Sequence, residues 1–322
     1  MQKFNAERDS NHADNNIQTS SNEEANHTYE FRSFEMLKST MRKEAERASA
    51  AGNFADITIS FNDVPPSIID SLISERRTPF YRISLFDKEE QEIIITMPKG
   101  FHETTIHFAT AMFDRALERV HMLHTMQKKR STLAPYDEGN NRGIEPDECY
   151  QLKPRYRGDQ PLGRWPQVVI EVSSSESDAS LRRNVARWFE RSNMAVRLVL
   201  TVKVSKGKVR LAAWTITAEA ALSFRGEIAA DRVGNEFRLQ PGSRDIDISF
   251  RALFFRDPVP EHGESNLKLL CSDVIELKDM LDKEVTGYYD GSPTVKSEID
   301  PPPSDDELNQ ETDTIADLMK SS

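Results

Sequence analysis

The sequence has little of what secreted and membrane proteins need. Its only two cysteines, Cys149 and Cys271, are too few for a disulfide framework. No stretch approaches the ~18 apolar residues that a transmembrane helix requires. The N-terminal sequence MQKFNAERDSNHADNN lacks the apolar segment of a secretory signal. These absences predict an intracellular protein, cytoplasmic or nuclear, that is not secreted and does not bind a membrane.

Hydrophobic residues are also scarce, at 37% of the 322 residues. A globular domain usually has about 45–50%. The shortage is greatest at the two ends, which are polar and acidic and lack periodicity. We therefore expect a disordered segment over residues 1–28, a folded domain over 29–265, and an acidic, mostly disordered tail over 266–322. Within the tail, Leu270, Val274, Leu277 and Leu281 predict one short amphipathic helix.

The net charge of −11 is concentrated in this tail. Residues 272–322 contain 14 acidic and 4 basic residues, whereas residues 126–210 contain 17 basic and 10 acidic residues. An acidic chain as a whole argues against nucleic-acid binding, but a basic middle removes that objection. The distribution predicts contact with nucleic acid through residues 126–210 and with a protein partner through the acidic tail. The oligomeric state is not predicted.

Alternating helix and strand patterns predict the fold class. From residue 79 onward the order is strand, strand, helix, strand, strand, helix, strand, strand, preceded by a helix over residues 29–52. This order predicts an α/β or α+β protein with one mixed central sheet flanked by helices. The expected strands are 80–87, 92–97, 144–152, 167–173, 196–205 and 209–217, and the later helices begin near residues 101 and 179.

Two carboxylates in the middle of the chain form the first candidate site. Glu171 interrupts the apolar strand QVVIEVS, and Asp147 lies at the start of the preceding strand. Consecutive strands usually neighbour each other, so the two carboxylates can converge. Two carboxylates can hold Mg²⁺, which neutralises charge on a phosphate and activates water. In the alternative interpretation, Glu171 is an ordinary solvent-facing residue of a half-exposed strand.

The sequences EPDECY and WPQVVIEVSSSESDASLRRNVARWF, with IIITMPKGFHETTIHFATAMF upstream, resemble a known family. It is the restriction-endonuclease-like family of the PD-(D/E)XK nuclease superfamily, and more closely its fungal branch. The resemblance covers residues 80–217. It implies a mixed sheet flanked by helices and Mg²⁺- or Mn²⁺-dependent cleavage of phosphodiesters. The family's motif carboxylates fall on Asp147 and Glu171, which would hold the metal, and its helix histidine falls on His102.

The sequence departs from the superfamily motif at its lysine. The motif lysine follows the glutamate by two positions, where this chain has Ser173. In this family the lysine is often moved into the next helix, and the matching position there is Val185. Arg182, Arg183, Arg187 and Lys203 are the candidate substitutes. An arginine can stabilise a pentavalent phosphorus but does not act as a base, because guanidinium does not deprotonate in proteins.

His102 also begins the sequence HETTIH, which invites comparison with the zinc-binding motif HExxH. The spacing to His107 is one residue too long. At ~100° per residue, positions i and i+5 lie ~140° apart around a helix. The two rings therefore cannot bind one zinc ion, and we reject that interpretation.

Two functions remain open from the sequence. The first is a metal-dependent nuclease of the PD-(D/E)XK type with Asp147, Glu171, Arg183, Lys203 and His102 in its catalytic site. The second is a nuclease-fold domain that has lost cleavage and acts as a nucleic-acid-binding or protein-binding module. The empty lysine positions motivate the second.

Overall fold

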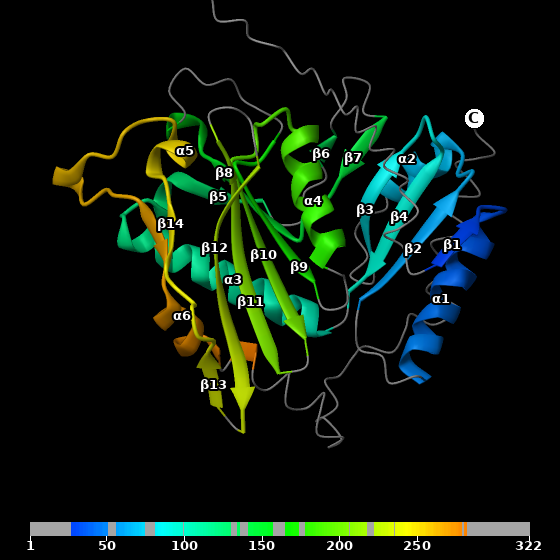
Figure 1. Cartoon of the computed structure of the whole chain (residues 1–322). Helices are drawn as coiled ribbons and strands as arrows, with labels where there is room; N and C mark the ends of the chain where they lie inside the picture. The colour runs from blue at the N-terminus through cyan, green and yellow to red at the C-terminus, as the bar shows by residue number, and fades with distance from the viewer. Residues whose placement is uncertain are drawn as a thin grey trace, which may run out of the picture.

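The structure is a computed structural model of the 322-residue chain (Figure 1). It describes residues 27–50, 56–74, 81–98, 100–129, 134–135, 141–156, 165–173, 178–205, 207–217, 222–234, 236–278 and 280–281. The predicted N-terminal segment up to residue 26 and the tail from residue 282 lie outside this part. The interaction predicted for the acidic tail therefore stays a prediction.

The first of two large sheets is built mainly from the N-terminal third of the chain. Its strand order is β1-β2-β4-β3-β7-β6, with β1 parallel to β2 and the other pairs antiparallel. The strands are β1 (His27–Glu30), β2 (Ile57–Asn62), β3 (Arg82–Asp87), β4 (Glu92–Met97), β6 (Ala134–Pro135) and β7 (Arg142–Ile144).

Two helices, α1 (Phe34–Ala50) and α2 (Pro66–Ser74), cover one face of this first sheet. Leu37 of α1 and Ile69 of α2 pack against Ile59, Ile93 and other alternate residues of β2 and β4. The alternation of these strands places the next residues on the opposite face. That face carries polar side chains and turns toward the second sheet (Figure 1).

The second large sheet has the order β13-β12-β11-β10-β9-β8-β5. Only β9 and β10 are parallel, and the other neighbours are antiparallel. The strands are β5 (Met126–Lys128), β8 (Glu148–Leu152), β9 (Val168–Ser173), β10 (Leu198–Ser205), β11 (Lys208–Ile216), β12 (Leu222–Val233) and β13 (Glu236–Leu239). The parallel pair needs a crossover connection, and α4 (Asp178–Arg191) supplies it.

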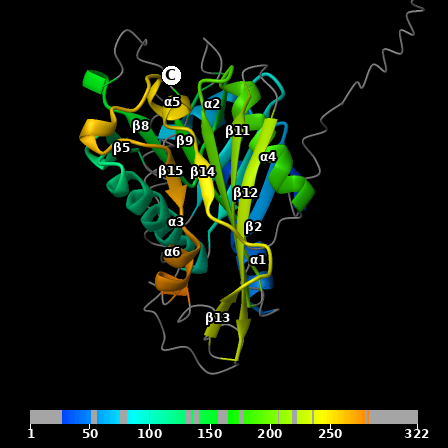
Figure 2. The same cartoon turned by 60° about the vertical axis from the view of Figure 1, so that its left-hand side comes forward.

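Helices cover both faces of the second sheet. Figure 2 shows α3 (Gly100–Arg119) and α6 (Cys271–Glu276) on one side of its strands and α4 on the other. On the α3 side, Phe113 and Leu117 pack against Val168, Ile170 and other apolar residues. On the α4 side, Val185 and Trp188 pack with Val169 and Val199. The alternating residues of β9 thus enter two separate cores.

A small third sheet closes the α3 side. It pairs β14 (Ile246–Ile248) with β15 (Leu267–Leu269), and α5 (Phe250–Phe254) follows β14. Single 3-10 turns occur at Leu123–Thr125, Pro154–Tyr156 and Pro260–His262. Val274, Leu277 and Leu281 are buried in the same core as α3. Residues 266–281, placed in the tail by the sequence analysis, therefore pack with the body of the fold.

The predicted fold class is confirmed, because mixed sheets flanked by helices form the structure. The expectation of one sheet is wrong: the strands expected at 80–87 and 92–97 belong to a different sheet from β9. β1, β2 and α2 were not predicted, and His27 and Thr28, placed in the N-terminal tail, lie in β1. Both cysteines are free thiols. Within the described residues, no helix is long and apolar enough to cross a membrane.

A partly buried ion pair links the segment after α5 to the turn before β15. The Arg256 guanidinium donates to both carboxylate oxygens of Glu264, at 2.5 and 2.6 Å, and the Val259 backbone N–H donates to Oε2 at 2.7 Å. The Glu264 side chain is only 8% exposed. The Arg256 hydrogen bonds, helped by that of Val259, lower the pKa of Glu264 to about 2.

This pair predicts an acid-sensitive part of the stability. Because the folded-state pKa lies below the ordinary 4.5, the stabilisation is complete above pH 4.5 and is lost as the pH falls toward 2. Because the Arg256 side chain is 43% exposed, solvent screens the pair and its contribution is about 1 kcal/mol. Glu264→Gln should be less stable at neutral pH and show a smaller loss in acid, measured by urea unfolding at several pH values. Parallel acid profiles for the two proteins would contradict this.

Candidate functional site: a buried carboxylate held by Arg82 and His102

Asp147 lies at the bend that leads into β8, at the edge between the two large sheets. The ladder pairs Glu148 with Ile170, so Asp147 lies beside the segment that contains Glu171 and Val172. Its side chain is fully buried. The backbone N–H of Val172 donates to Oδ2 of Asp147 at 2.6 Å. The carboxylate therefore fixes the end of β8 against β9.

His102, in the first turn of α3, connects Asp147 to a second carboxylate. Its Nε2 lies 2.9 Å from Oδ1 of Asp147, and its Nδ1 lies 2.7 Å from Oδ2 of Asp56, just before β2. The imidazole ring therefore bridges the two carboxyl groups. The predicted proximity of His102 to the acid site is present. His107 is exposed, which agrees with the rejected zinc interpretation.

Arg82, at the start of β3, is the partner that sequence reasoning missed. Its Nη1 contacts Oδ1 of Asp147, and its side chain is 16% exposed. Asp147 is thus in ionic contact with a guanidinium, within hydrogen-bonding distance of an imidazole ring, and accepts from a backbone amide. Hydrogen bonds to charged groups are shorter and stronger than neutral ones. The only signal in the sequence was a charged residue at the start of the apolar strand 80–87.

Glu171 points to the other side of β9, toward α4. Its Oε1 accepts a 2.6 Å hydrogen bond from the indole Nε1 of Trp188. The helix forms locally because Leu181, Val185, Trp188 and Phe189 recur at helical spacing and all four are buried. Glu171 is half-buried, so it is not the freely solvated residue of the alternative interpretation.

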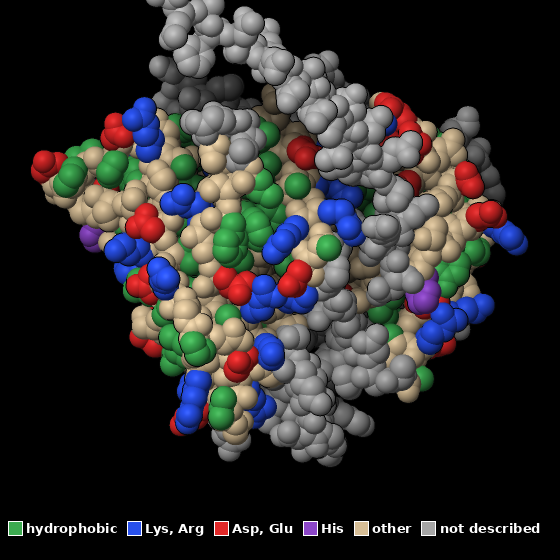
Figure 3. Space-filling model, viewed as in Figure 1, with side chains coloured by type: hydrophobic (Ala, Val, Ile, Leu, Met, Phe, Trp, Pro, Cys, Tyr) green, Lys and Arg blue, Asp and Glu red, His purple; other side chains and the backbone are tan. Residues whose placement is uncertain are grey.

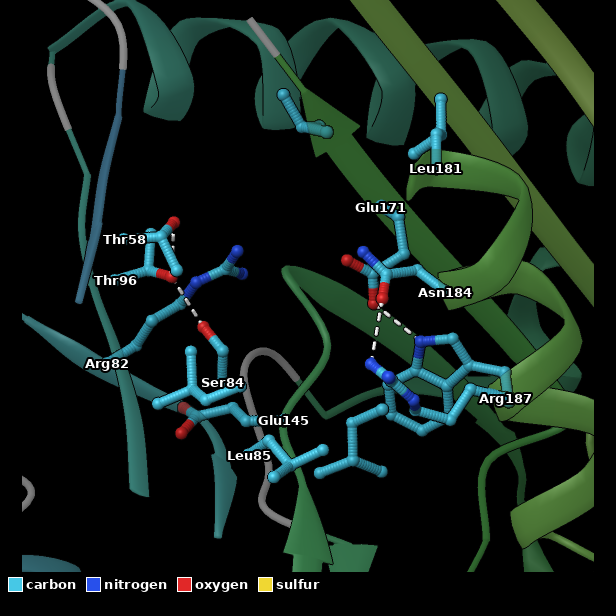
Figure 4. A pocket seen from close by; sticks show the side chains of 14 residues that line it. Thr58, Arg82, Ser84, Leu85, Thr96, Glu145, Glu171, Leu181, Asn184 and Arg187 are labelled. Carbon is cyan, nitrogen blue, oxygen red and sulfur yellow. Dashed lines mark hydrogen bonds between the residues drawn. The ribbon is translucent and has the colours of Figure 1, made fainter. Parts of the chain in front are cut away.

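A pocket lies between the polar face of the first sheet and the α4 side of the second. Arg82, Ser84, Thr96 and Glu145 line it from one side, and Glu171, Asn184, Arg187 and Trp188 from the other. In Figure 4 the Arg82 side chain extends into the space that separates it from Glu171. Asp147 lies behind Arg82 and does not line the pocket. Arg82 therefore stands between the Asp147 carboxylate and the pocket.

Lys203, the first candidate for the missing lysine, lies on β10 directly beside Ser173 of β9. Its Nζ donates to Oδ1 of Asp178 at 2.7 Å, and Arg210 donates to Oδ2 at 2.9 Å. These two hydrogen bonds, Lys203 first, lower the pKa of Asp178 to about 2. Lys203 thus neutralises Asp178 at the start of α4.

Arg183, the second candidate, is exposed on α4 and does not line the pocket. The two positions where the motif lysine was expected are both buried. Ser173 is 2% exposed and Val185 is not exposed at all. The structure therefore brings His102 to Asp147, and it brings Arg187, but neither Arg182 nor Arg183, to the pocket.

The described residues do not fit the divalent cation that the resemblance implies. Among them, no group of three or more His, Cys, Asp or Glu side chains is arranged to hold a metal ion. Oδ1 of Asp147 is contacted by both His102 Nε2 and the Arg82 guanidinium. A guanidinium in contact with a carboxylate also repels a metal cation approaching the same oxygen. Asp147 and Glu171 as a metal pair stay a prediction.

Comparisons with known proteins were made for the whole chain. No protein-family model and no curated protein matches it. One solved structure, described as a "putative nuclease belonging to DUF820" from Anabaena variabilis, aligns with 57% of this chain and 86% of its own. The sequence identity is 13% and the TM-score is 0.28. Similarity at this level does not establish a shared fold, and the fungal branch stays a prediction.

Proposed function

We propose that this protein binds nucleic acid through a nuclease-like domain that does not cleave it. The observation that carries the proposal is the engagement of both Asp147 carboxylate oxygens by Arg82, His102 and the Val172 backbone. A carboxylate held in these contacts stabilises the protein and is not free to bind a metal ion. Cleavage of a phosphodiester by two carboxylates needs the metal to activate water and to neutralise the phosphate.

The positions around the site support the absence of cleavage. A catalytic lysine near Glu171 would have to come from residue 173, residue 185 or Lys203. The first two are a buried serine and a buried valine. Lys203 is already paired with Asp178. Arginines on α4 do not replace a general base, because they keep their proton.

The surface around α4 supports the binding of an anionic polymer. Residues 178–210 contain nine Lys or Arg and only two acidic residues. Arg182, Arg183 and Arg191 of α4 are exposed. Figure 3 shows Lys and Arg side chains over α4 and the neighbouring strands β10 and β11. Clustered basic side chains bind phosphates without reading base sequence.

The direct test measures binding and cleavage in the same samples. The protein is titrated into fluorescently labelled single-stranded DNA, duplex DNA and RNA, with Mg²⁺, with Mn²⁺ or with EDTA. We expect salt-dependent binding, with log K falling by about 0.9 per phosphate contact for each decade of salt for duplex DNA. Affinity should be the same in EDTA, and gel analysis should find the labelled strands intact.

Charge removal on α4 provides the matched comparison. Arg183→Ala and Arg191→Ala should each weaken binding to all sequences alike and reduce the salt slope by about 1. Arg251→Ala, which removes a 73% exposed arginine on α5, should leave affinity unchanged. Equal effects from all three variants would show that net charge, and not the α4 surface, determines binding.

Two results would overturn the proposal. Metal-dependent cleavage that disappears in Glu171→Gln would identify an active nuclease, which is the function first implied by the resemblance. Absence of binding to every nucleic acid, from a folded protein at low salt, would leave the basic surface without this role.

A further inference from the structure

We propose that the nucleic acid bound by this protein is single-stranded, and that unpaired bases stack on an exposed aromatic surface beside α4. This aromatic surface consists of Trp214 and Ile216 of β11 with Leu222 and Phe224 of β12. The inference rests on the proposed function, because the basic residues of α4 supply the phosphate contacts. It names the class of nucleic acid that the site takes.

The aromatic surface lies on the face of the second sheet that carries α4, beyond the edge of that helix. The strand pairing places Trp214 beside Val199 of β10, and Phe224 beside Trp214. Side chains paired across neighbouring strands point to the same face, and Val199 belongs to the core under α4. Phe224, two strands away from Val199, is 53% exposed, and Leu222 is 43% exposed. The row of side chains therefore begins under the helix and ends in solvent.

The fold holds the two aromatic rings in place. The indole Nε1 of Trp214 donates to Oγ1 of Thr201 at 3.1 Å, and the ring centroids of Trp214 and Phe224 lie 4.8 Å apart with 54° between the ring planes. A cross-strand aromatic pair stabilises a sheet, but that role does not require half of Phe224 to stay in solvent. Exposed apolar side chains gathered on one surface mark a binding site. Rings that are already held lose little conformational freedom when a ligand stacks on them.

The charge around the aromatic surface indicates an anionic ligand. Lys208 and Arg210 alternate along β11 with Trp214 and therefore share its face, and Lys208 is exposed ~20 Å from Trp214 along the strand. Arg210 donates to Asp178 and Glu227, so the acidic groups nearest to it are neutralised. Figure 3 shows hydrophobic side chains over β11 and β12 with Lys and Arg side chains beside them. A polyanion that carries flat rings fits this combination.

Aromatic rings on a protein surface bind bases only where the bases are unpaired. In a duplex each base is stacked between its neighbours and presents only its edges in the grooves. Proteins that bind single strands combine aromatic rings, on which bases stack, with a basic surface that follows the backbone. A second copy of this chain on the aromatic surface would bring the basic residues of two α4 helices toward each other, and like charges repel. Single-stranded nucleic acid therefore fits better than a second copy.

The first test compares binding to a single strand and to a duplex by Phe224→Ala in the full chain. Fluorescence anisotropy follows a labelled oligothymidine of about 20 nucleotides, alone and annealed to its complement. We expect the unaltered protein to bind the single strand more tightly than the duplex. The variant should bind the single strand about 5-fold more weakly or worse and the duplex equally well, because stacking is lost and phosphate contacts remain. The salt slope should be the same for both proteins.

Further variants test whether the ring itself is required. Phe224→Tyr keeps a ring and should keep the affinity, whereas Phe224→Leu keeps an apolar side chain and should lose as much as Phe224→Ala. Leu239→Ala is the matched control, because Leu239 is 37% exposed on β13 and pairs with Ala230, which belongs to the core on the α3 side. It should bind as the unaltered protein does. Circular dichroism checks that each variant is folded.

Tryptophan fluorescence gives an independent measurement. Of the three tryptophans, Trp165 and Trp188 are buried and Trp214 is half-buried. A base that stacks on the aromatic surface should quench Trp214 and leave the two buried rings unaffected. Oligothymidine should therefore quench the fluorescence of the unaltered protein but not that of Trp214→Phe, which keeps a ring and should still bind.

Unchanged single-strand affinity in Phe224→Ala and Phe224→Leu, with salt-dependent binding intact, would overturn the inference and leave the proposed function standing. An equal loss for single strand and duplex would also overturn it, because stacking requires unpaired bases. A dimer that Phe224→Ala dissociates without changing single-strand affinity would assign the aromatic surface to a second copy of this chain instead. Absence of binding to every nucleic acid would overturn both the inference and the proposed function.

Discussion

Replacing Asp147 with alanine is expected to lower the free energy of unfolding by about 3–5 kcal/mol. The change leaves the Arg82 guanidinium without its carboxylate and removes the acceptor of both His102 Nε2 and the Val172 amide. Removing one partner of a buried ion pair is costly because the remaining charge stays buried and uncompensated. Urea unfolding followed by circular dichroism measures the loss.

The sign of this result distinguishes two roles for Asp147. If Asp147 serves only to bind a metal ion, its charge repels the neighbouring carboxylates when the metal is absent. Asp147→Ala should then stabilise the protein in EDTA. If Asp147 serves to hold Arg82 and His102, it stabilises the protein with or without metal, and Asp147→Ala should destabilise the protein in both conditions. Asp257→Ala is the control, because Asp257 is 75% exposed and pairs with an exposed arginine. Surface changes of this kind usually stay within about 0.5 kcal/mol.

Trp188→Ala is expected to lower the free energy of unfolding by about 3–5 kcal/mol, mainly through the cavity left in the α4 core. Trp188 is fully buried and packs edge-on against Trp165, with ring centroids 6.1 Å apart. The substitution also removes the hydrogen bond donated to Glu171 at 2.6 Å. Thermal and urea unfolding measure the combined loss.

Trp188→Phe separates these two contributions. Phenylalanine fills much of the space but donates no hydrogen bond to Glu171, so the loss should be smaller than for Trp188→Ala and should include about 1 kcal/mol for the missing hydrogen bond. Trp188→Phe combined with Glu171→Gln should cost less than the sum of the two single changes, because the two residues share one interaction. Strict additivity would mean that the hydrogen bond contributes nothing.

Local patterns predicted the elements that position Glu171. The strand 167–173 and the helix beginning near 179 follow from short-range periodicity, and they form β9 and α4. The hairpin of β10 and β11 follows from its two-residue alternation. The same signal existed for β2, where Ile57, Ile59 and Phe61 alternate with polar residues, but it was not used.

The contacts of Asp147 were only partly predictable. His102 came from the resemblance, and the structure places it 2.9 Å from Asp147. Arg82 and Asp56 lie 65 and 91 residues before Asp147 in the sequence, and their approach depends on how the two sheets pack. No local periodicity contains that information. The incorrect prediction of a single sheet has the same cause, because the pairing of strands that are distant in sequence depends on the whole fold.

The path of the chain through the two sheets has a consequence for how the protein holds together. β6 and β7 complete the first sheet, yet they lie in the sequence between α3 and β8, which belong to the second. A fragment ending at residue 97 would leave β3 as an open sheet edge, and such edges pair with other chains. We therefore expect the two sheets to unfold as one cooperative unit, because the first sheet is not formed by one continuous stretch of the chain.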